Sequence, residues 1–418
     1  MAATTHHCRS CGCEDLKSVL DLGITPLADR MPSAAHADRD EPRFPLEVVF
    51  CPECSLVQIL ETVDPAMLFD DDYPYFSSFS KYLLEHSRKN VLELIERRKL
   101  GPQSLVIELA SNDGYLLKNY VEQGVPVLGI DPVKSLCEAA EKIGVRSRAE
   151  FFGLDVAKGL VAEGFRADVI HGNNVLAHVA DTNGFVAGIA ALLKQDGMAV
   201  IEFPYVRDLI DHCEFDTIYH EHLCYFSVTA VDKLLRRHGL FLNDVRRLPI
   251  HGGSLRLFIE KHDAPNEAVR GLLAEERTLG LDTLDYYREF STRVADLKTD
   301  LLALLRGLKA EGKTIAAYGA AAKGSTLINY VGIGRELLDF VADKNVHKQG
   351  RLMPGQKIPI VAAEQIAARK PDYVLLLPWN LESEILAQEQ AYRDGGGKFI
   401  IPVPTRSEER RVGKECSL

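Results

Sequence analysis

The chain has 418 residues, enough for two or three domains, and its 46% hydrophobic and 26% charged residues are ordinary for a globular protein. A net charge of −11 argues against nucleic acid as the main partner, because binding to phosphates needs a basic surface. The sequence also lacks an apolar run of about 18 residues, so we expect no membrane span.

The sequence starts with MAATTHHCRSCGCED, which has neither the charged n-region nor the apolar h-region of a secretory signal. We therefore expect a cytoplasmic protein. Thiols stay reduced in the cytoplasm, where clustered cysteines bind a metal more often than they form disulfides.

Two C-x-x-C pairs lie near the start, Cys8 and Cys11 in CRSC and Cys51 and Cys54 in CPEC. Four thiolates complete a tetrahedral zinc shell and leave no position open for chemistry, so the pairs predict structural zinc rather than a redox site. The 39 residues between them, positions 12–50, predict an inserted loop or hairpin. Cys13 lies too close to Cys11 to share its turn. We assign residues 1–68 to a small zinc-binding domain, which metal binding would stabilise.

Strand and helix patterns alternate from residue 104 onward, after an amphipathic helix. The predicted strands are SLVIEL, VPVLGIDP, ADVIHGNN and DGMAVIEFP, and this rhythm is typical of a parallel sheet covered by helices. The segment LFLNDVRRLPIHGGSLRLFIEK then predicts two strands joined by a turn at an antiparallel edge. We assign residues 69–262 to this second, Rossmann-like domain.

A third part begins at about residue 263 with a long, charged helical stretch. The runs TIAAYG, LLDFVADKN, DYVLLLPWN and KFIIPVP predict another open α/β sheet, so residues 263–406 form a C-terminal Rossmann-like domain. Residues 407–418, SEERRVGKECSL, break the pattern and resemble translated sequencing-adaptor read-through, so we regard them as a non-native tail. The fold class is α/β throughout.

The first strand of the second domain ends at Glu108 and is followed by ASNDG. A dinucleotide site needs G-x-G-x-x-G, of which only Gly114 is present. Asp131 ends the next strand, 23 residues after Glu108 (131 − 108), where it could accept both hydroxyls of a ribose. S-adenosylmethionine fits this site, because it combines a ribose with a cationic sulfonium that favours acidic surroundings. The alternative is an ordinary strand–turn–helix with Asp113 as N-cap.

The loop YGAAAKGST in the third part also follows a strand, but it is not a P-loop because Lys323 precedes Gly324. A lysine at a helix N-terminus still makes an anion site, since the helix dipole and free N–H groups add to its charge. A diphosphate or sugar nucleotide would fit there. The alternative is a glycine turn with a solvated lysine.

The segment FDTIYHEHLCYFS, residues 215–227, contains two histidines, a glutamate and two tyrosines. A metal site is disfavoured because H-E-x-x-H is absent, and a polar surface loop is the second alternative. We favour an acid–base site, because histidine titrates near neutrality and the segment follows the strand VIEFP closely.

Several strings together strongly resemble the three-domain sugar C-methyltransferases, which act on nucleotide-linked 4-keto-deoxysugars. They occur in the expected order over residues 8 to about 405, and they are CRSC…CPEC, DYPYFSSFS, VIELASNDGYLL, GNNVLAHV, YHEHLCYFS, HGGSLR and YGAAAKGSTLINY. The resemblance implies that the second domain is a class I, S-adenosylmethionine-dependent methyltransferase domain and that the C-terminal domain helps to bind a nucleotide-linked 4-keto sugar.

The resemblance also implies a mechanism. A base removes a hydrogen from the carbon beside the ketone, and the resulting enolate takes the methyl group of S-adenosylmethionine. The family pattern Tyr-x-Glu-His maps to Tyr219, Glu221 and His222, with His222 as base and the other two orienting it and sharing the charge. His178 and a tyrosine of YPYF would also line the reaction centre, and we favour Tyr75 over Tyr73, although the register between the two stays open. His220 lies outside the pattern and is expected to be structural.

The remaining family positions are implied for binding. Those expected to bind the cofactor are Glu108, Ala110, Ser111, Asn112, Gly114, Asp131, Asn173 and Asn174. Those expected to bind the substrate are Tyr73, Phe76, Ser77, Arg256, Tyr318, Lys323 and Asn329. One departure is Ala110, where the family often has glycine.

Other functions compete with this one. An O- or N-methyltransferase would use the same cofactor, and a non-catalytic sugar-nucleotide-binding protein would have lost the acid–base residues that this chain keeps. A nicotinamide-dependent oxidoreductase is disfavoured by the missing glycines. The methylated carbon (C3 or C5), the nucleotide, the sugar's substituents and stereochemistry, and the oligomeric state stay open.

Overall fold

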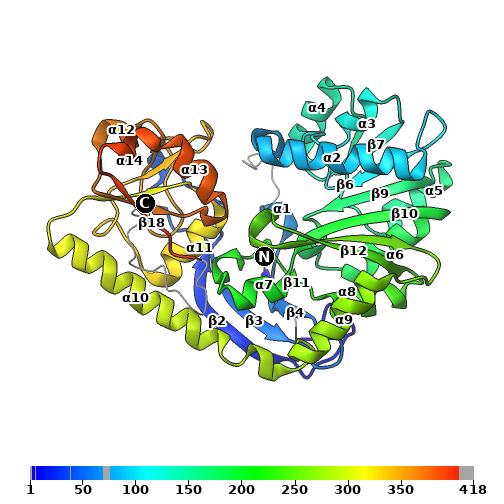
Figure 1. The fold of residues 1–418 in the computed structure, drawn as a ribbon, viewed down its shortest axis with the longest axis horizontal. Coiled ribbons are helices and arrows are strands. Elements are labelled where there is room, and N and C mark those ends of the chain that lie inside the picture. The colour runs from blue at the N-terminus through cyan, green and yellow to red at the C-terminus, as the bar shows by residue number, and fades with distance from the viewer. Residues whose placement is uncertain (1, 5, 38, 69–75, 404–418) are drawn as a thin grey trace.

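The computed structural model describes residues 2–4, 6–37, 39–68 and 76–403. It confirms the α/β class, with strands and helices organised around separate sheets (Figure 1). Tyr73, Tyr75 and the predicted tail 407–418 lie outside the described residues. In the described ranges, no helix is both long and apolar enough to cross a membrane.

The N-terminal part is an antiparallel sheet, which we call the zinc sheet, shown in blue at the base of Figure 1. Strands β2 (Lys17–Pro26) and β3 (Arg43–Phe50) form a hairpin that fills the gap between the two cysteine pairs, which confirms the predicted insertion. Strand β4 (Val57–Ile59) pairs with β3, and the fourth strand, β11 (Cys224–Tyr225), comes from the middle of the chain. Beside it, β1 (Ala2–Thr4) pairs with β5 (Glu61–Val63), and α1 (Pro65–Leu68) follows.

The second part is a seven-stranded sheet in the order β12-β13-β10-β9-β6-β7-β8. Its parallel strands include all four that the sequence predicts, and they are β6 (Val106–Leu109), β7 (Val127–Asp131), β8 (Ser147–Ala149), β9 (Ala167–Asn173) and β10 (Leu193–Pro204). The antiparallel edge is also confirmed, as β12 (Phe241–Leu248) and β13 (Ser254–Glu260).

Helices cover this sheet, and several begin where a short polar side chain can accept a bond from a free backbone N–H group. Ser80, Asp181 and Ser227 cap α2, α6 and α8 in this way. The helices of this part are α2 (Lys81–Arg98), α3 (Lys118–Glu122), α4 (Lys134–Lys142), α5 (Leu154–Ala162), α6 (Thr182–Leu192), α7 (Val206–Asp211) and α8 (Val228–Arg237).

The C-terminal part, yellow to red in Figure 1, has an all-parallel sheet in the order β16-β15-β14-β17-β18. Its strands are β14 (Ile315–Tyr318), β15 (Val341–Asp343), β16 (Ile360–Ala362), β17 (Tyr373–Leu376) and β18 (Lys398–Ile400). Its helices are α9 (Glu267–Leu279), α10 (Phe290–Ala310), α11 (Ala322–Val331), α12 (Gln365–Arg369), α13 (Glu382–Gln388) and α14 (Gln390–Asp394). Helix α9 packs on α8 and β12 of the second part.

In both sheets the first parallel strand lies between the second and the fourth. In the second part β6 lies between β7 and β9, and in the C-terminal part β14 lies between β15 and β17. The chain reverses its direction of winding beside such a strand, and ligands of open α/β sheets bind at its carboxyl end. One cluster of buried hydrophobic residues includes members of all three parts.

Candidate active site

Residues 215–227, which we call the base segment, connect α7 to α8. A 3-10 turn (Phe215–Thr217) opens the segment, and the N–H of His222 donates to the carbonyl of Tyr219 at 2.8 Å to close a tight turn. The segment ends as strand β11 and at Ser227, the N-cap of α8. Both ends of the acid–base motif are therefore fixed by secondary structure.

The His222 ring is held at both nitrogens. Nδ1 lies 2.8 Å from the carbonyl of Thr217, so Nδ1 carries the proton and donates it, and Nε2 accepts from the Tyr219 hydroxyl at 2.9 Å. Burial lowers the pKa of His222 to about 4, and the nearby Lys323 charge acts in the same direction. At neutral pH the ring is therefore uncharged, with its basic nitrogen on the side of Tyr219.

His178 lies against His222 at a ring-centroid distance of 4.7 Å and nearly perpendicular to it. It ends a 3-10 turn (Leu176–His178) that follows β9, and burial holds its pKa well below the ordinary value. Glu221 is buried in the same turn as His222. The structure thus brings the rings of Tyr219, His178 and His222 together, with Glu221 buried next to His222 in the chain. The fifth residue predicted at the reaction centre, Tyr75, lies outside the described residues.

His220 is directed away from this group. Its Nε2 lies 3.0 Å from the carbonyl of Pro45, and its ring packs edge-on against Phe44 of strand β3. It is 1% exposed. This agrees with the structural role expected for it.

The loop of residues 110–114, which we call the cofactor loop, has a positive φ at every second position. Ala110 has φ 56°, Asn112 49° and Gly114 78°. These are the positions that a Gly-x-Gly-x-Gly loop would fill with glycine, and asparagine tolerates the left-handed region better than alanine does. At Gly114 a Cβ atom would also lie 3.1 Å from Ala140 and Val145.

Replacing Ala110 with glycine should stabilise the fold by about 1 kcal/mol, because a left-handed alanine costs roughly 1–2 kcal/mol and the flexibility of glycine offsets part of this gain. Chemical denaturation of the two proteins would measure the difference. Ala187→Gly, in the middle of α6, is the matched control and should destabilise the fold by about 1 kcal/mol. If Ala110→Gly were less stable than the parent protein, this would contradict backbone strain at the left-handed Ala110.

Acidic and unpaired polar groups surround the cofactor loop, which fits S-adenosylmethionine. The Glu108 carboxylate is fully buried and has no hydrogen-bond partner among the described residues, and burial beside Asp131 and Asp113 raises its pKa well above the ordinary value. Asp131 accepts bonds from the N–H groups of Asn112 and Val133, both at 2.9 Å. A sulfonium cation would relieve this crowding of negative charge.

The other predicted cofactor residues lie at the same sheet edge. Asn173 is the last residue of β9, and its side-chain amide oxygen and nitrogen have no hydrogen-bond partner among the described residues. The Ser111 hydroxyl also has no partner there. Asn174 follows with a φ of 54°. Buried polar groups without partners are costly, so this edge is suited to a polar ligand that supplies the missing bonds.

Residues 76–78 lie across the cofactor loop. The N–H of Ser77 donates to Asn112 Oδ1 at 2.9 Å, and the N–H of Ser78 donates to Asp113 Oδ2 at 3.1 Å. The Phe76 ring stacks on His347 of the C-terminal part at a centroid distance of 6.1 Å. The predicted substrate residues Phe76 and Ser77 therefore stand between the cofactor edge and the C-terminal part.

Lys323 lies in the first turn of α11, where its Nζ bonds Asn380 Oδ1 at 2.8 Å and stands 4.4 Å from the centre of the Trp379 ring. The Trp379 indole N–H donates to Asp216 of the base segment at 2.8 Å. Burial raises the pKa of Asp216 to about 6 and that of neighbouring Glu214 to about 7. The lysine is therefore held by a polar cluster rather than solvated.

The sequence motifs did not reveal Glu214, Asp216, Trp379 or Asn380. One signal was available in HGGSLR. At Gly252, with φ 94°, a Cβ atom would lie 2.6 Å from Glu214 Oε2 and 2.7 Å from a Trp379 ring carbon. A glycine pair there marks a close approach of the backbone to other groups.

The surroundings of three predicted substrate residues are as follows. Arg256 on β13 is 5% exposed and pairs with Glu202 and His86. Asn329 donates to the carbonyls of Ser325 and Pro354 and lines a separate cavity of about 400 Å³ beside β2. Tyr318 is buried at the end of β14, and its hydroxyl has no partner among the described residues. Their contact with substrate stays a prediction.

The four predicted zinc ligands converge. The sulfur atoms of Cys8, Cys11, Cys51 and Cys54 all lie within 4.8 Å of one another, and they form the one such metal-ligand group found in the described ranges. Cys8 and Cys54 are 3.4 Å apart, and Cys11 and Cys51 are 3.5 Å apart. A zinc–sulfur distance of about 2.3 Å gives a tetrahedron with edges of roughly 3.8 Å, which fits this group. Mutual hydrogen bonding and burial raise the pKa of Cys8 and Cys51 to about 12, so a cation is needed to hold them as thiolates.

Family models match the three parts of the chain in order. Residues 8–69 match a zinc binding domain, residues 79–243 a methyltransferase domain, and residues 249–404 a C-methyltransferase C-terminal domain.

One curated relative matches nearly end to end. The C-methyltransferase NovU of Streptomyces niveus is 37% identical over 414 residues, which cover 98% of each chain. The ubiquinone biosynthesis O-methyltransferase of Bartonella quintana (strain Toulouse) is 27% identical over 97 residues, 23% of this chain and 39% of that protein. Among solved structures, the magnesium protoporphyrin IX methyltransferase of Synechocystis PCC 6803 with bound SAM aligns with a TM-score of 0.34 and 14% identity, over 43% of this chain and 79% of that one. A likeness as distant as the last says nothing about the reaction.

Proposed function

Because this chain belongs to the family of C-methyltransferases that combine a zinc-binding domain, a methyltransferase domain and a C-terminal domain of their own, we propose that it methylates the carbon beside the ketone of a nucleotide-linked 4-keto-deoxysugar. The chain is a methyltransferase, with S-adenosylmethionine and structural zinc as its cofactors. What we propose beyond this is the sugar substrate, the enolate intermediate and the identity of the base.

One observation carries the proposal, namely the neutral His222 ring with a fixed tautomer. A carbon acid must lose a proton to a general base before it can take a methyl group, and the base must be uncharged at working pH. Thr217 holds the proton on Nδ1, so Nε2 keeps the lone pair. Burial lowers the pKa of His222 to about 4, which keeps the ring neutral at the expense of its basicity.

A weaker base needs an enolate that is well stabilised, and the surrounding residues support this. Tyr219 is 2.9 Å from Nε2 and can turn its O–H group to the ketone oxygen when the substrate approaches. The carbon–hydrogen electron pair then passes into the enolate while the proton moves to Nε2. Bound S-adenosylmethionine supplies an electrophilic methyl group. We assign Glu221 and His178 to stabilising the resulting imidazolium and Tyr75 to the same centre.

The proposed cofactor site consists of Glu108, Asp131 and Asn173 with the cofactor loop. Acidic side chains there favour the sulfonium, and Asp131 at the end of β7 can bind the ribose. For the sugar nucleotide we propose the edge between Phe76 and Lys323. The ammonium of Lys323, held by Asn380 and Trp379, would bind the diphosphate.

The domain boundaries at residues 68/69, 262/263 and 406/407 are part of the proposal. The cytoplasmic location is also part of it. The four-cysteine group supports the location, since cysteines remain available to a metal where thiols are reduced.

Incubation with S-adenosylmethionine and a panel of nucleotide-linked 4-keto sugars should yield a product heavier by one methyl group that retains the ketone. NMR of that product would locate the new carbon–carbon bond at C3 or C5. A sugar without the 4-keto group is the matched control and should not react, because its ring hydrogens are not acidic. Methylation on oxygen or nitrogen would overturn the proposal in favour of an O- or N-methyltransferase.

A further inference from the structure

The base segment is built partly into the zinc sheet. In strand β11, Cys224 pairs with Gln58 and Tyr225 with Val57 of β4, two residues after His222. The N–H of Ile59 donates to the carbonyl of Leu223 at 3.0 Å. The backbone that follows His222 is therefore hydrogen-bonded to the N-terminal domain rather than to the seven-stranded sheet.

The same short stretch also holds the second histidine of the site. The N–H of Leu223 donates to the carbonyl of Ala177 at 2.7 Å, and Ala177 immediately precedes His178. Leu223 is thus bonded on one side to β4 and on the other to the turn that carries His178. The relative position of the two imidazoles depends on this backbone link.

Gln58 ties β4 to the first cysteine pair. Its side chain is fully buried, its Oε1 accepts the N–H of Arg9 at 2.8 Å, and its Nε2 donates to the carbonyl of His7 at 3.1 Å. His7 and Arg9 flank the zinc ligand Cys8. A displacement of the first pair would therefore be transmitted to β4 through two hydrogen bonds.

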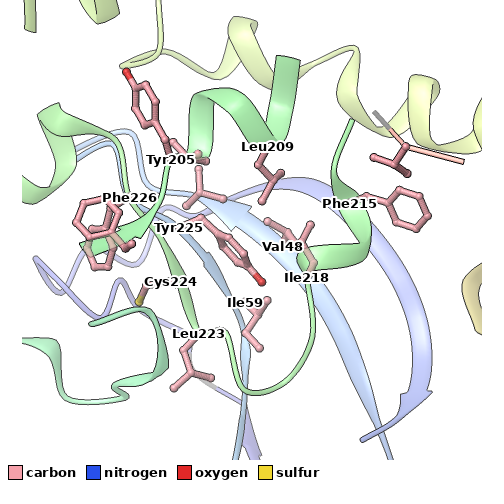
Figure 2. Close-up of a cluster of buried hydrophobic side chains, with 14 of the residues drawn as sticks. Val48, Ile59, Tyr205, Leu209, Phe215, Ile218, Leu223, Cys224, Tyr225 and Phe226 are labelled. Carbon is pink, nitrogen blue, oxygen red and sulfur yellow. The ribbon is translucent and has the colours of Figure 1, made fainter. Parts of the chain in front are cut away.

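Apolar packing reinforces the link (Figure 2). Val48 and Ile59 of the zinc sheet lie in one buried cluster with Ile218, Leu223 and Tyr225 of the base segment. Each of these side chains is no more than 7% exposed. Because close-packed interiors have few voids, a shift of the zinc sheet would move the base segment with it.

We propose that the zinc-binding domain positions the catalytic base, and that Gln58 is a positioning residue that acts through β4 and β11 on His222. The inference rests on the proposed function, in which His222 is the base. Gln58 itself touches neither substrate nor cofactor. Its role is to keep β4 aligned with the cysteine group, so that β11 holds the His222 turn in place.

The variant Gln58→Met, which removes both side-chain hydrogen bonds at similar volume, should lower kcat about 10- to 100-fold. The KM for S-adenosylmethionine should stay within about two-fold, because the cofactor loop lies on other strands. Gln58→Glu keeps an acceptor for the N–H of Arg9 and should recover part of the loss. Ser18→Ala removes one hydrogen bond to Glu47 in the same sheet and should leave kcat unchanged.

Two measurements separate this inference from the choice of substrate. NMR titration of the His222 ring should give a pKa near 4 in the parent protein and a value closer to the ordinary 6.5 in Gln58→Met, whatever the methyl acceptor is. Hydrogen exchange at the amides of Ile59 and Leu223 should speed up in the same variant. If the 4-keto sugars fail but both shifts appear, the positioning holds and only the proposed function falls.

The contrary result is equally clear. If Gln58→Met retains one zinc per chain, with an unchanged kcat, an unchanged His222 titration and unchanged amide exchange, Gln58 does not position the base. If Gln58→Met loses its zinc, the same measurements of kcat, His222 titration and amide exchange on Gln58→Glu test whether Gln58 positions the base. A uniform loss of stability and cofactor binding in Gln58→Glu would mark a purely structural residue and overturn the inference.

Discussion

Replacing His222 with alanine should abolish methyl transfer while S-adenosylhomocysteine still binds. General-base catalysis contributes roughly 10²–10⁴ in rate, and the variant lacks the imidazole Nε2 that lies 2.9 Å from the Tyr219 hydroxyl. The proposed cofactor-binding residues Glu108 and Asp131 lie on β6 and β7, so removal of the ring should leave them in place. Calorimetry with S-adenosylhomocysteine and a product assay would measure the two effects separately.

The neighbouring histidine supplies the control for this experiment. His220→Gln keeps a donor for the carbonyl of Pro45 and should retain most of the activity. Full turnover in His222→Ala would remove His222 as base. Equal losses in both variants would show that the whole segment had moved, rather than that one proton acceptor was missing.

The pH dependence gives an independent signature of the same residue. If His222 is the base, it acts in its neutral form, so kcat should fall as the pH drops through about 4. A histidine with an ordinary pKa would instead give a midpoint near 6.5. A midpoint there would contradict the buried, neutral ring.

Replacing Cys51 with serine should eliminate zinc binding and destabilise the whole N-terminal part. Structural zinc sites contribute about 10 kcal/mol or more of apparent binding energy, so the melting temperature should fall by more than about 10 °C. Because β4 pairs with β11, which begins two residues after His222, activity should fall as well. Metal analysis should find one zinc per chain in the parent and none in Cys51→Ser, and calorimetry would record the melting temperatures.

Cys13 provides the matched substitution. It lies two residues from Cys11 and outside the group whose sulfur atoms lie within 4.8 Å of one another. Cys13→Ser should therefore keep its zinc and its melting temperature. Zinc retained in Cys51→Ser, or absent from the parent protein, would refute the structural role of the metal.

Local patterns account for the elements that the sequence predicted correctly. The spacing of Cys8, Cys11, Cys51 and Cys54 reflects the geometry of the metal, and the apolar runs at residues 104–109 and 125–132 reflect strands buried on both faces. The conformation of the cofactor loop was harder to predict, because its backbone is left-handed at Ala110 and Asn112 and neither position is glycine.

Contacts between distant segments could not be read from the same patterns. Strand β11 has two residues, too few for any period, and its pairing with β4 joins positions more than 160 apart, 224 and 58. The bond from Trp379 to Asp216 likewise spans a sequence separation of 163. Burial of Arg256 beside Glu202 depends on strand register, which a motif such as HGGSLR does not reveal.

The chain contains a single tryptophan, and it lies where the C-terminal part meets the base segment. Its indole donates to Asp216 on one side and carries the Lys323 ammonium over its face on the other. The tryptophan emission of the protein, when it is excited selectively over that of the tyrosines, therefore comes from one residue where the C-terminal part meets the base segment. Substrate bound at Lys323 would change the quenching of this ring, so binding could be followed optically without attaching a dye.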